Sequence, residues 1–260
     1  MGLKNLLIGR KWLQPVYERL FRISLRGMNY GMAAFVESSG ELNLIRSLPS
    51  ILQRDSLVIF DVGSNDGDYA SHLVNEIGSH HKLHFFEPSP EAFSALTKRL
   101  KSVDVDKVRL NNFGLSSEAK IAPLYFDQKG TGWASIHKIS HPHLGVNLDQ
   151  SEEIQLKTLD KYCQENGVEE IDFLKMDVEG HEKEVLLGAK EMIEAGKIKC
   201  IQFEFGIAHL ISKVFLREFF DILRDYNIYR VLQDGIYKIT YNERYEVFMN
   251  SNYFALKKRI

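Results

Sequence analysis

The sequence predicts an α/β fold in which helices cover both faces of a central, mainly parallel sheet. Two observations carry this prediction. Short apolar runs at 57–60, 83–86 and 108–110 alternate with amphipathic segments of helical period. Each run stops at small, polar or acidic residues, as buried parallel strands do where they lead into ligand-binding turns. The alternation implies right-handed crossovers between neighbouring strands.

Length and composition favour one domain with an extension. The chain has 260 residues, 44% of them hydrophobic, which is enough to bury a sizeable core. We expect a helical extension over 1–52 and a single domain over 53–260. The net charge of -2 offers no general attraction to nucleic acid. Cys163 and Cys200 are too few for a disulfide framework, and we expect reduced thiols in a cytoplasmic protein.

The first 30 residues are strongly basic. They hold six Lys or Arg residues against Glu18 alone, namely Lys4, Arg10, Lys11, Arg19, Arg22 and Arg26. Apolar residues recur between them at helical spacing over 3–26, where Pro15 is expected to start or kink a segment. We expect a helix packed on the domain with a solvated basic face. The alternative is a membrane-surface or partner helix, which would place the protein at the inner face of a membrane.

The remaining elements follow the chain in the order that an alternating fold requires. Further helices are expected at 40–52, 69–77, 91–100, 158–166, after 182, and at 214–226, and further strands at 171–176, 198–205, 229–232 and 253–256. The last two strands are joined without a helix and should pair antiparallel. The periodicity weakens over about 121–156, which we expect to be a loop-like insertion that carries the substrate.

A turn after the first strand is the expected ligand-binding element. The glycines Gly63 and Gly67 permit backbone angles and close approaches that a Cβ would forbid. A helix that starts near Gly67 presents unpaired N–H groups and the positive end of its dipole. The turn is therefore suited to a ligand with a carboxylate or ribose oxygens, although its residues can also serve only to shape the chain.

The acids near this turn favour one nucleoside ligand over others. A dinucleotide site prefers Gly-x-Gly-x-x-Gly, but Gly63, Asn65 and Asp68 occupy those places. Acids would repel a pyrophosphate, yet they suit a ligand with an ammonium group. Glu87 ends the second strand and is placed to accept hydrogen bonds from both ribose hydroxyls, while Asn112 ends the third and is placed to contact an adenine edge. These groups favour S-adenosylmethionine.

Four segments resemble the motifs of the FkbM-type family of S-adenosylmethionine-dependent methyltransferases, and the likeness covers about 57–206. Residues 60–69 look like the first motif, with Ser64 in place of the alanine expected there. Residues 86–90 are similar to the ribose-binding motif, and 203–204 to the acid that ends the fifth strand. The most distinctive segment is 175–189, which includes Asp-Val-Glu-Gly-His-Glu. A departure at Phe113, where a small residue is expected, bears on the adenine contacts.

The resemblance implies a class I methyltransferase sheet of seven strands with the last one antiparallel. It also implies O-methylation of a hydroxyl on a sugar, glycan or related natural product. The residues and the resemblance together assign cofactor binding to Asp61, Gly63, Ser64, Asn65, Gly67, Tyr69, Glu87, Pro88, Asn112 and Asp177.

The acceptor is expected at the carboxyl ends of the strands, where catalytic candidates converge. They are Asp177, Glu179, His181 and Glu204. Methyl transfer from a sulfonium is an in-line displacement, so the protein must align the acceptor oxygen and remove its proton. His181 is the natural general base, with an ordinary pKa of about 6.5, or else only a helix-start residue. Asp177 ends a buried strand, where an acid without a task would be costly.

Two groups of side chains are alternative candidates for metal-ion sites. Asp177 and Glu204 end adjacent strands and are placed to hold Mg²⁺ that acidifies a substrate hydroxyl, although two carboxylates are a thin ligand set. A weaker zinc set lies in the insertion, at His137, His141 and His143. In the same segment Trp133 is placed to stack on a sugar ring or to anchor the loop.

A second class of function stays open beside the enzyme. The chain is alternatively a binding or scaffold protein that keeps the cofactor fold and docks through its basic helix, although its four catalytic candidates argue against this. Nucleic-acid methylation is disfavoured because the core has no basic stripe and no Asn-Pro-Pro-Tyr motif.

Overall fold

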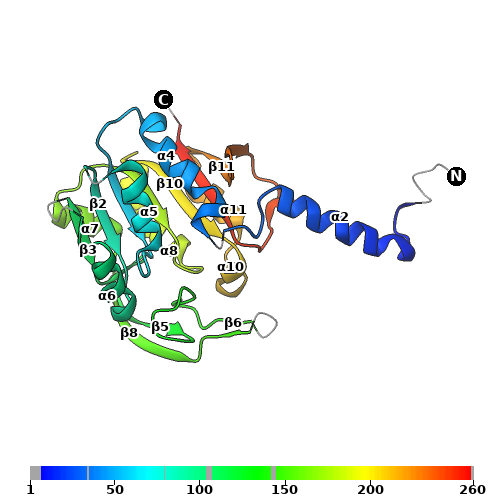
Figure 1. Ribbon diagram of the computed structural model, residues 1–260, viewed down its shortest axis with the longest axis horizontal. Helices are drawn as coiled ribbons and strands as arrows, with labels where there is room; N and C mark the ends of the chain where they lie inside the picture. The colour runs from blue at the N-terminus through cyan, green and yellow to red at the C-terminus, as the bar shows by residue number, and fades with distance from the viewer. Residues whose placement is uncertain (1–6, 34, 79, 104–106, 142–144, 259–260) are drawn as a thin grey trace.

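The computed structural model describes residues 7–258 except 34, 79, 104–106 and 142–144. Its centre is a sheet with helices on both faces (Figure 1). The strands of this sheet are β1 (Val58–Val62), β2 (Lys82–Phe86), β3 (Val108–Asn111), β9 (Ile171–Met176), β10 (Ile198–Phe205), β11 (Tyr226–Leu232), β12 (Gly235–Ile239) and β13 (Ser251–Lys257). Their order is β12-β11-β13-β10-β9-β1-β2-β3.

The sheet has eight strands among the described residues, so the expected number of seven is wrong by one. The turn at Asp234 does not end the sheet but closes a hairpin, in which Leu232 pairs with Gly235 and β12 runs antiparallel to β11. The reversed strand is confirmed, because β13 pairs antiparallel with both β10 and β11. The five neighbouring strands β3, β2, β1, β9 and β10 of this sheet run parallel to one another.

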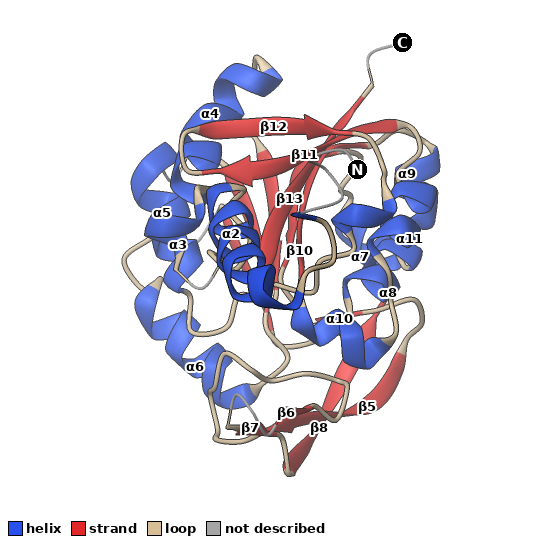
Figure 2. Cartoon of the chain, turned by 90° about the vertical axis from the view of Figure 1, so that its right-hand side faces the viewer, coloured by secondary structure: helices blue, strands red, loops and turns tan. Residues whose placement is uncertain are grey.

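Two groups of helices cover the sheet, as the alternating pattern predicts. One face is covered by α4 (Glu41–Leu52), α5 (Asp68–Ile77) and α6 (Pro90–Arg99). The other is covered by α7 (Leu159–Asn166), α8 (Glu182–Leu187), α9 (Lys190–Glu194) and α11 (Leu216–Ile222) (Figure 2). The helix expected over 214–226 is the shorter α11, and a further helix, α10 (Ile207–Ser212), precedes it and ends where Lys213 takes a left-handed conformation. Cys163 and Cys200 are buried and unbridged, as expected.

The segment 121–156 is not the loop that its weak periodicity suggested. It contains β5 (Lys120–Phe126) and β8 (Gln150–Lys157), which pair antiparallel and form a second sheet with β4 (Gly114–Leu115). β5 turns Ala122, Leu124 and Phe126 inward in strict alternation. Pro123 is tolerated because β5 is an edge strand. A short hairpin of β6 (Ser140–His141) and β7 (Val146–Asn147) continues the insertion.

The N-terminal helix does not pack on the domain, which corrects our expectation. The 3₁₀ turn η1 (Lys11–Leu13) leads into α2 (Gln14–Gly27), where Pro15 starts the helix because its first turn needs no donor. α2 projects from the body of the domain (Figure 1), and Leu25 is the one buried residue along this fully described helix. None of the helices in the described part of the chain is long and apolar enough to cross a membrane.

The segment after α2 returns to the domain. The amide of Asn29 donates to the carbonyls of Ser39 and Val231, and the N–H of Gly31 donates to Asn250 O. The helix α3 (Val36–Ser39) and α4 follow at once. The boundary at 52 stays a prediction, and these contacts tie 29–52 to the sheet.

Candidate active site

A cavity of about 650 Å³ opens at the carboxyl ends of β1, β2, β9 and β10. Its walls come from the turns that follow these strands, from the insertion around Trp133 and from the segment after α2. Parallel sheets bind ligands at this edge because several loops converge there. Most of the expected site residues meet at this cavity.

The turn after β1 forms one wall and contacts the turn after β9. Gly63 has a φ of +83°, and a Cβ at this position would overlap the carbonyl oxygen of Asp177, so only glycine fits. The Ser64 hydroxyl donates to Asp61 O at 2.9 Å. Gly67 is also left-handed, but it is not in the cavity wall, and a Cβ there would lie 2.8 Å from Leu96 Cδ1. Its role is to let α5 approach α6.

Glu87 lies beside this turn and is 6% exposed. Its carboxylate accepts the N–H of Asn65 and the N–H of Ser89, both at 2.8 Å. Burial raises the pKa of Glu87 to about 7, against the opposing effect of those two hydrogen bonds. Glu87 and Pro88 both line the cavity, where a carboxylate keeps further lone pairs for a ligand.

Asn112 does not line the cavity, in contrast to the expected adenine contact. Its side-chain amide donates to the carbonyl of Glu87 at 2.9 Å and to that of Pro88 at 3.1 Å. The residue is exposed on the outside of the turn. It therefore supports the backbone that carries Glu87.

Lys175 is a cavity residue that the sequence reasoning did not select. Its Nζ lies 3.4 Å from Asp61 Oδ1, 3.3 Å from Asp177 Oδ2 and 4.4 Å from the centre of the Tyr69 ring. Burial acts to lower the pKa of Lys175, but the charges of Asp61, Asp177 and Glu41 outweigh it and raise the pKa above its usual value. The signal was available, because a lysine in an apolar strand needs a partner.

Asp61 is fully buried and does not line the cavity, although the sequence suggested that it touches the ligand. It lies opposite Lys175 in the β1–β9 pairing. The effect of Asp61 on the cavity is exerted through Lys175.

Tyr69 offers a hydroxyl to whatever fills the cavity. The residue lines the wall and is 6% exposed, and its hydroxyl has no hydrogen-bond partner among the described residues. Buried hydroxyls are nearly always paired, so an unpaired one at a cavity wall indicates a ligand.

Three carboxylates in the cavity wall gather where β9 and β10 end. Oxygens of Asp177, Glu179 and Glu204 lie within 4.8 Å of one another, the one such group in the described part of the chain. Asn250 donates to Glu204 Oε2 at 3.0 Å. Burial, and next the charge of Asp177, raise the pKa of both Glu179 and Glu204 well above the usual value. A positively charged group bound here would relieve that cost.

His181 follows Glu179 by two residues and also lines the cavity. Its Nε2 lies 3.0 Å from Ser116 Oγ, while Nδ1 is buried without a hydrogen-bond partner in the described structure. Burial, and next the nearby His137, lower the pKa of His181 to about 4. The ring is therefore neutral at physiological pH, whereas the sequence suggested an ordinary histidine that is partly charged.

The insertion forms a wall over the carboxylates. The Ser135 hydroxyl donates to Glu179 O at 2.7 Å. Trp133 packs on a small cluster of Ile139, Leu148 and Ala208 and also lines the cavity, so its anchoring role is confirmed and sugar stacking stays a prediction. The expected zinc set stays untested, because His143 lies outside the described residues and the side chain of His141 is not described.

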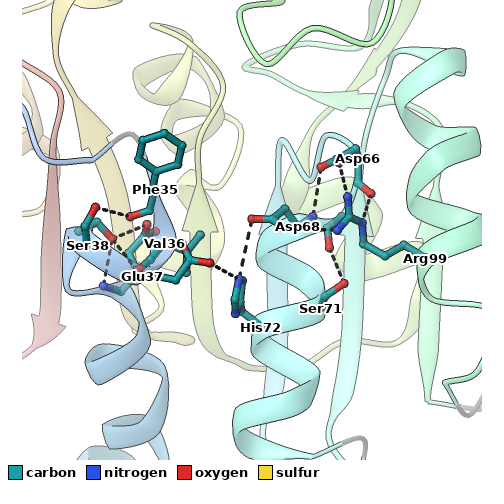
Figure 3. A network of polar contacts seen from close by, with 12 residues as sticks. Phe35, Val36, Glu37, Ser38, Asp66, Asp68, Ser71, His72 and Arg99 are labelled. Atoms are coloured by element: carbon teal, nitrogen blue, oxygen red, sulfur yellow. Dashed lines mark hydrogen bonds and ion pairs between the residues drawn. The ribbon is translucent and has the colours of Figure 1, made fainter.

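The segment after α2 forms a further wall, which no sequence signal predicted. Gly31, Ala33, Phe35 and Val36 line the cavity. Glu37 Oε1 lies 3.2 Å from Nε2 of His72, and this ion pair links the segment to α5 (Figure 3). Near the start of α5, Arg99 of α6 binds the carboxylates of Asp66 and Asp68, which also line the cavity (Figure 3).

Comparison with known proteins adds an independent result. The methyltransferase FkbM domain matches residues 61–227. The 2-O-methyltransferase NoeI of Sinorhizobium fredii is 27% identical over 208 residues, which are 76% of this chain and 84% of NoeI. The hexuronic acid methyltransferase AglP of Haloferax volcanii is 27% identical over 168 residues, 65% of this chain and 64% of AglP. The crystal structure of methyltransferase FkbM from Methylobacillus flagellatus KT is 17% identical with a TM-score of 0.47, covering 81% of this chain and 47% of that one.

Proposed function

The chain belongs to the FkbM methyltransferase family, and from that premise we propose that it transfers a methyl group from S-adenosylmethionine to a hydroxyl of a sugar, glycan or related natural product. One observation carries the proposal: the groups suited to the cofactor and the groups suited to proton transfer open on the same cavity. The names of two relatives, a 2-O-methyltransferase and a hexuronic acid methyltransferase, support a sugar acceptor.

The residues near β1 and β2 fit the cofactor. S-adenosylmethionine supplies an activated methyl group on a sulfonium, together with ribose hydroxyls, an ammonium group and a carboxylate. We assign the ribose hydroxyls to the Glu87 carboxylate. Lys175 and the unpaired Tyr69 hydroxyl suit the carboxylate as donors. Gly63, Ser64 and Asn65 shape the wall between them, and Asn112 acts through the backbone of Glu87.

We assign the acceptor to the side of the cavity that holds His181. Its Nδ1 is unpaired and the ring is neutral, so it can take a proton from an acceptor hydroxyl without first losing one. Glu179 and Glu204 are placed to accept hydrogen bonds from sugar hydroxyls, and Asp177 to orient both ligands. Positioning of this kind supplies much of the rate in a displacement between two bound reactants.

A divalent cation is a second proposal for the same carboxylates. Asp177 and Glu204 were expected as ligands, and Glu179 supplies a third oxygen donor in the hard set that Mg²⁺ prefers. Treating the protein with a chelator and then adding Mg²⁺ tests this. Activity that is lost and restored supports a metal, while full activity in the chelator assigns the carboxylates to the organic ligands alone.

We also propose a cytoplasmic protein that contacts the inner face of a membrane through its N-terminal helix.

The alternative function is that of a non-catalytic scaffold protein. It would gain support if the Asp177→Ala variant kept full activity in the pathway of this protein.

Methyl-labelled S-adenosylmethionine tests the function directly. The purified protein is incubated with it and a panel of nucleotide sugars, glycans and hydroxylated metabolites, and label in an acceptor is counted. The His181→Gln variant is the negative control. We expect label in a sugar hydroxyl with the wild-type protein, and failure to bind the cofactor in calorimetry would reject the proposal.

A further inference from the structure

The stretch from Ile8 to Ile23, which includes η1 and most of α2, carries a large apolar surface that the domain leaves uncovered. Trp12 is 71% exposed, Phe21 61% and Ile23 57%. Further apolar residues along the same stretch are also exposed, namely Ile8, Val16, Tyr17 and Leu20. Isolated apolar residues are common on surfaces, but a contiguous exposed set indicates an interaction site.

The basic residues of α2 lie on a separate face. At about 100° per residue, Arg19, Arg22 and Arg26 fall within about 60° of one another. Val16, Leu20 and Ile23 occupy a different sector of similar width, centred about 90° away. The helix is therefore amphipathic, with arginines along one side of an exposed apolar stripe.

The apolar surface continues to the mouth of the cavity. Met28 directly follows α2 and is 36% exposed. Phe35 at 70% and Met249 at 38% are exposed and also line the cavity. The N–H of Gly31 donates to Asn250 O, which brings this segment to the chain next to Met249. Whatever covers α2 thus lies close to the opening of the active site.

The positive charge of the N-terminal stretch favours an anionic partner for the exposed apolar surface. Glu18 is the one acid between residues 7 and 27, against five Lys or Arg residues, Arg10, Lys11, Arg19, Arg22 and Arg26. A second copy of the chain would bring an equally basic helix against the first, with like charges side by side. An anionic lipid surface attracts the arginines and accepts the apolar stripe, and Trp12 and Tyr17 are residue types that favour the headgroup region.

We propose that α2, with Met28, Phe35 and Met249, is a docking surface for an anionic phospholipid bilayer and holds the mouth of the cavity against the lipid headgroups. The residues of α2 do not line the cavity, and the docking would stand even if the proposed reaction were wrong. Contact is peripheral, since the apolar stripe is one face of a short helix.

Vesicle flotation of the full chain tests the docking. We expect binding to vesicles of phosphatidylcholine mixed with phosphatidylglycerol, and much weaker binding to phosphatidylcholine alone. The Arg19→Gln/Arg22→Gln/Arg26→Gln variant should lose on the order of 100-fold in partition, at about 1 kcal/mol per arginine. The matched control is Lys161→Gln/Lys190→Gln, which removes exposed lysines of α7 and α9 and should leave binding unchanged.

Tryptophan fluorescence gives a second readout. The chain has two tryptophans, and Trp133 is half-buried in the insertion. We expect anionic vesicles to shift the emission of Trp12 to shorter wavelength, and the shift to vanish in the Trp12→Phe variant. Ile121→Ser, which alters an equally exposed apolar residue on β5, is the control that keeps it.

Three results would overturn the proposal. They are equal binding to both kinds of vesicle, flotation that survives Trp12→Ser/Leu20→Ser/Phe21→Ser, and a dimer in solution that this variant disrupts while the wild-type protein ignores vesicles. A folded far-ultraviolet circular dichroism spectrum of the variant shows that lost binding is not lost folding.

Discussion

Nε2 of His209 lies 3.0 Å from Oε2 of Glu182, and the two side chains are 1% and 0% exposed. Glu182 also accepts the N–H of Val178 at 2.9 Å, and His209 Nδ1 accepts the N–H of Gly206. The pair therefore fastens the turn after β9 to the turn after β10. These turns carry the carboxylates of the cavity, so the pair positions the site without touching it.

Removing one partner should destabilise the whole domain. We expect His209→Ala to lower the free energy of unfolding by about 3–5 kcal/mol, because it leaves a buried carboxylate without its partner. Urea denaturation measures the change. The control is Glu165→Gln, which removes an exposed pair with Lys161 and should cost under about 0.5 kcal/mol. A similar small loss in both variants would mean that the buried pair contributes little.

The Glu182–His209 pair predicts that the free energy of unfolding depends on pH. Burial acts to raise the pKa of Glu182, but His209 and the Val178 N–H outweigh it and hold the pKa below its usual 4.5. The carboxylate therefore stabilises the fold above pH 4.5, and this contribution is lost as pH falls through the lower folded pKa. Unfolding free energies between pH 7 and 3 should fall more steeply for the wild-type protein than for Glu182→Gln.

Cofactor affinity should rise with pH around neutrality. The pKa of Glu87 is about 7 in the free protein because of burial, and only the ionised form offers acceptors to both ribose hydroxyls. We expect calorimetry to show tighter binding at pH 8 than at pH 6. Glu87→Gln should remove that dependence and weaken binding at pH 8 by about 10-fold or more. Glu91→Gln, on the exposed side of α6, should behave as the wild-type protein.

The hydroxyl of Tyr69 should affect binding and not folding. Because this hydroxyl has no partner among the described residues, Tyr69→Phe removes no internal hydrogen bond. We expect cofactor affinity to fall by about 5–10-fold with an unfolding free energy within about 0.5 kcal/mol of the wild-type value. Tyr253→Phe changes a buried tyrosine outside the cavity wall and should leave affinity unchanged. Equal affinity in all three proteins would exclude the contact.

His181 is expected to act as the base over the whole neutral range. His181→Gln keeps a polar side chain near Ser116 but cannot take a proton, so kcat should fall by about 10²–10⁴-fold with little change in cofactor affinity. Ser116→Ala removes only the partner of Nε2 and should have a smaller effect. At saturating substrates, a pKa of about 4 predicts that His181 causes no loss of kcat between pH 8 and 6. A loss of kcat centred near pH 6.5 would instead indicate an unperturbed histidine.

Docking at a bilayer should favour acceptors carried by lipids. With labelled cofactor and anionic vesicles, we expect a sugar acceptor joined to a lipid tail in the bilayer to be methylated faster than the same sugar free in solution. The Arg19→Gln/Arg22→Gln/Arg26→Gln variant should lose the difference and keep its rate on the free acceptor. A preference that survives in this variant would separate acceptor choice from the helix.

The local sequence determined much of the cavity wall that follows β1 and β2. An apolar strand that ends in Gly63, Ser64 and Asn65, followed by a second strand that ends in Glu87, encodes its geometry within a few residues. A strand end always faces the same edge of a parallel sheet. The positions of Asp177 and Glu204 at that edge were predictable for the same reason.

Contacts between distant segments decided the rest. The contact between the buried side chains of Asp61 and Lys175 follows from the pairing of β1 with β9, and it leaves Asp61 outside the cavity wall. The pKa of His181 depends on burial and on His137 from the insertion, neither of which is visible in the order of residues.

The N-terminal region shows most clearly what could not be predicted from the sequence. The sequence alone shows that 3–26 is amphipathic and basic, because helical period is a local property. Whether the apolar face of a helix packs on its own domain depends on whether the fold offers it a complementary surface. Here α2 projects from the domain with that face exposed, and the following segment closes the cavity wall. The tertiary structure thus turned an expected packing helix into an exposed surface beside the active site.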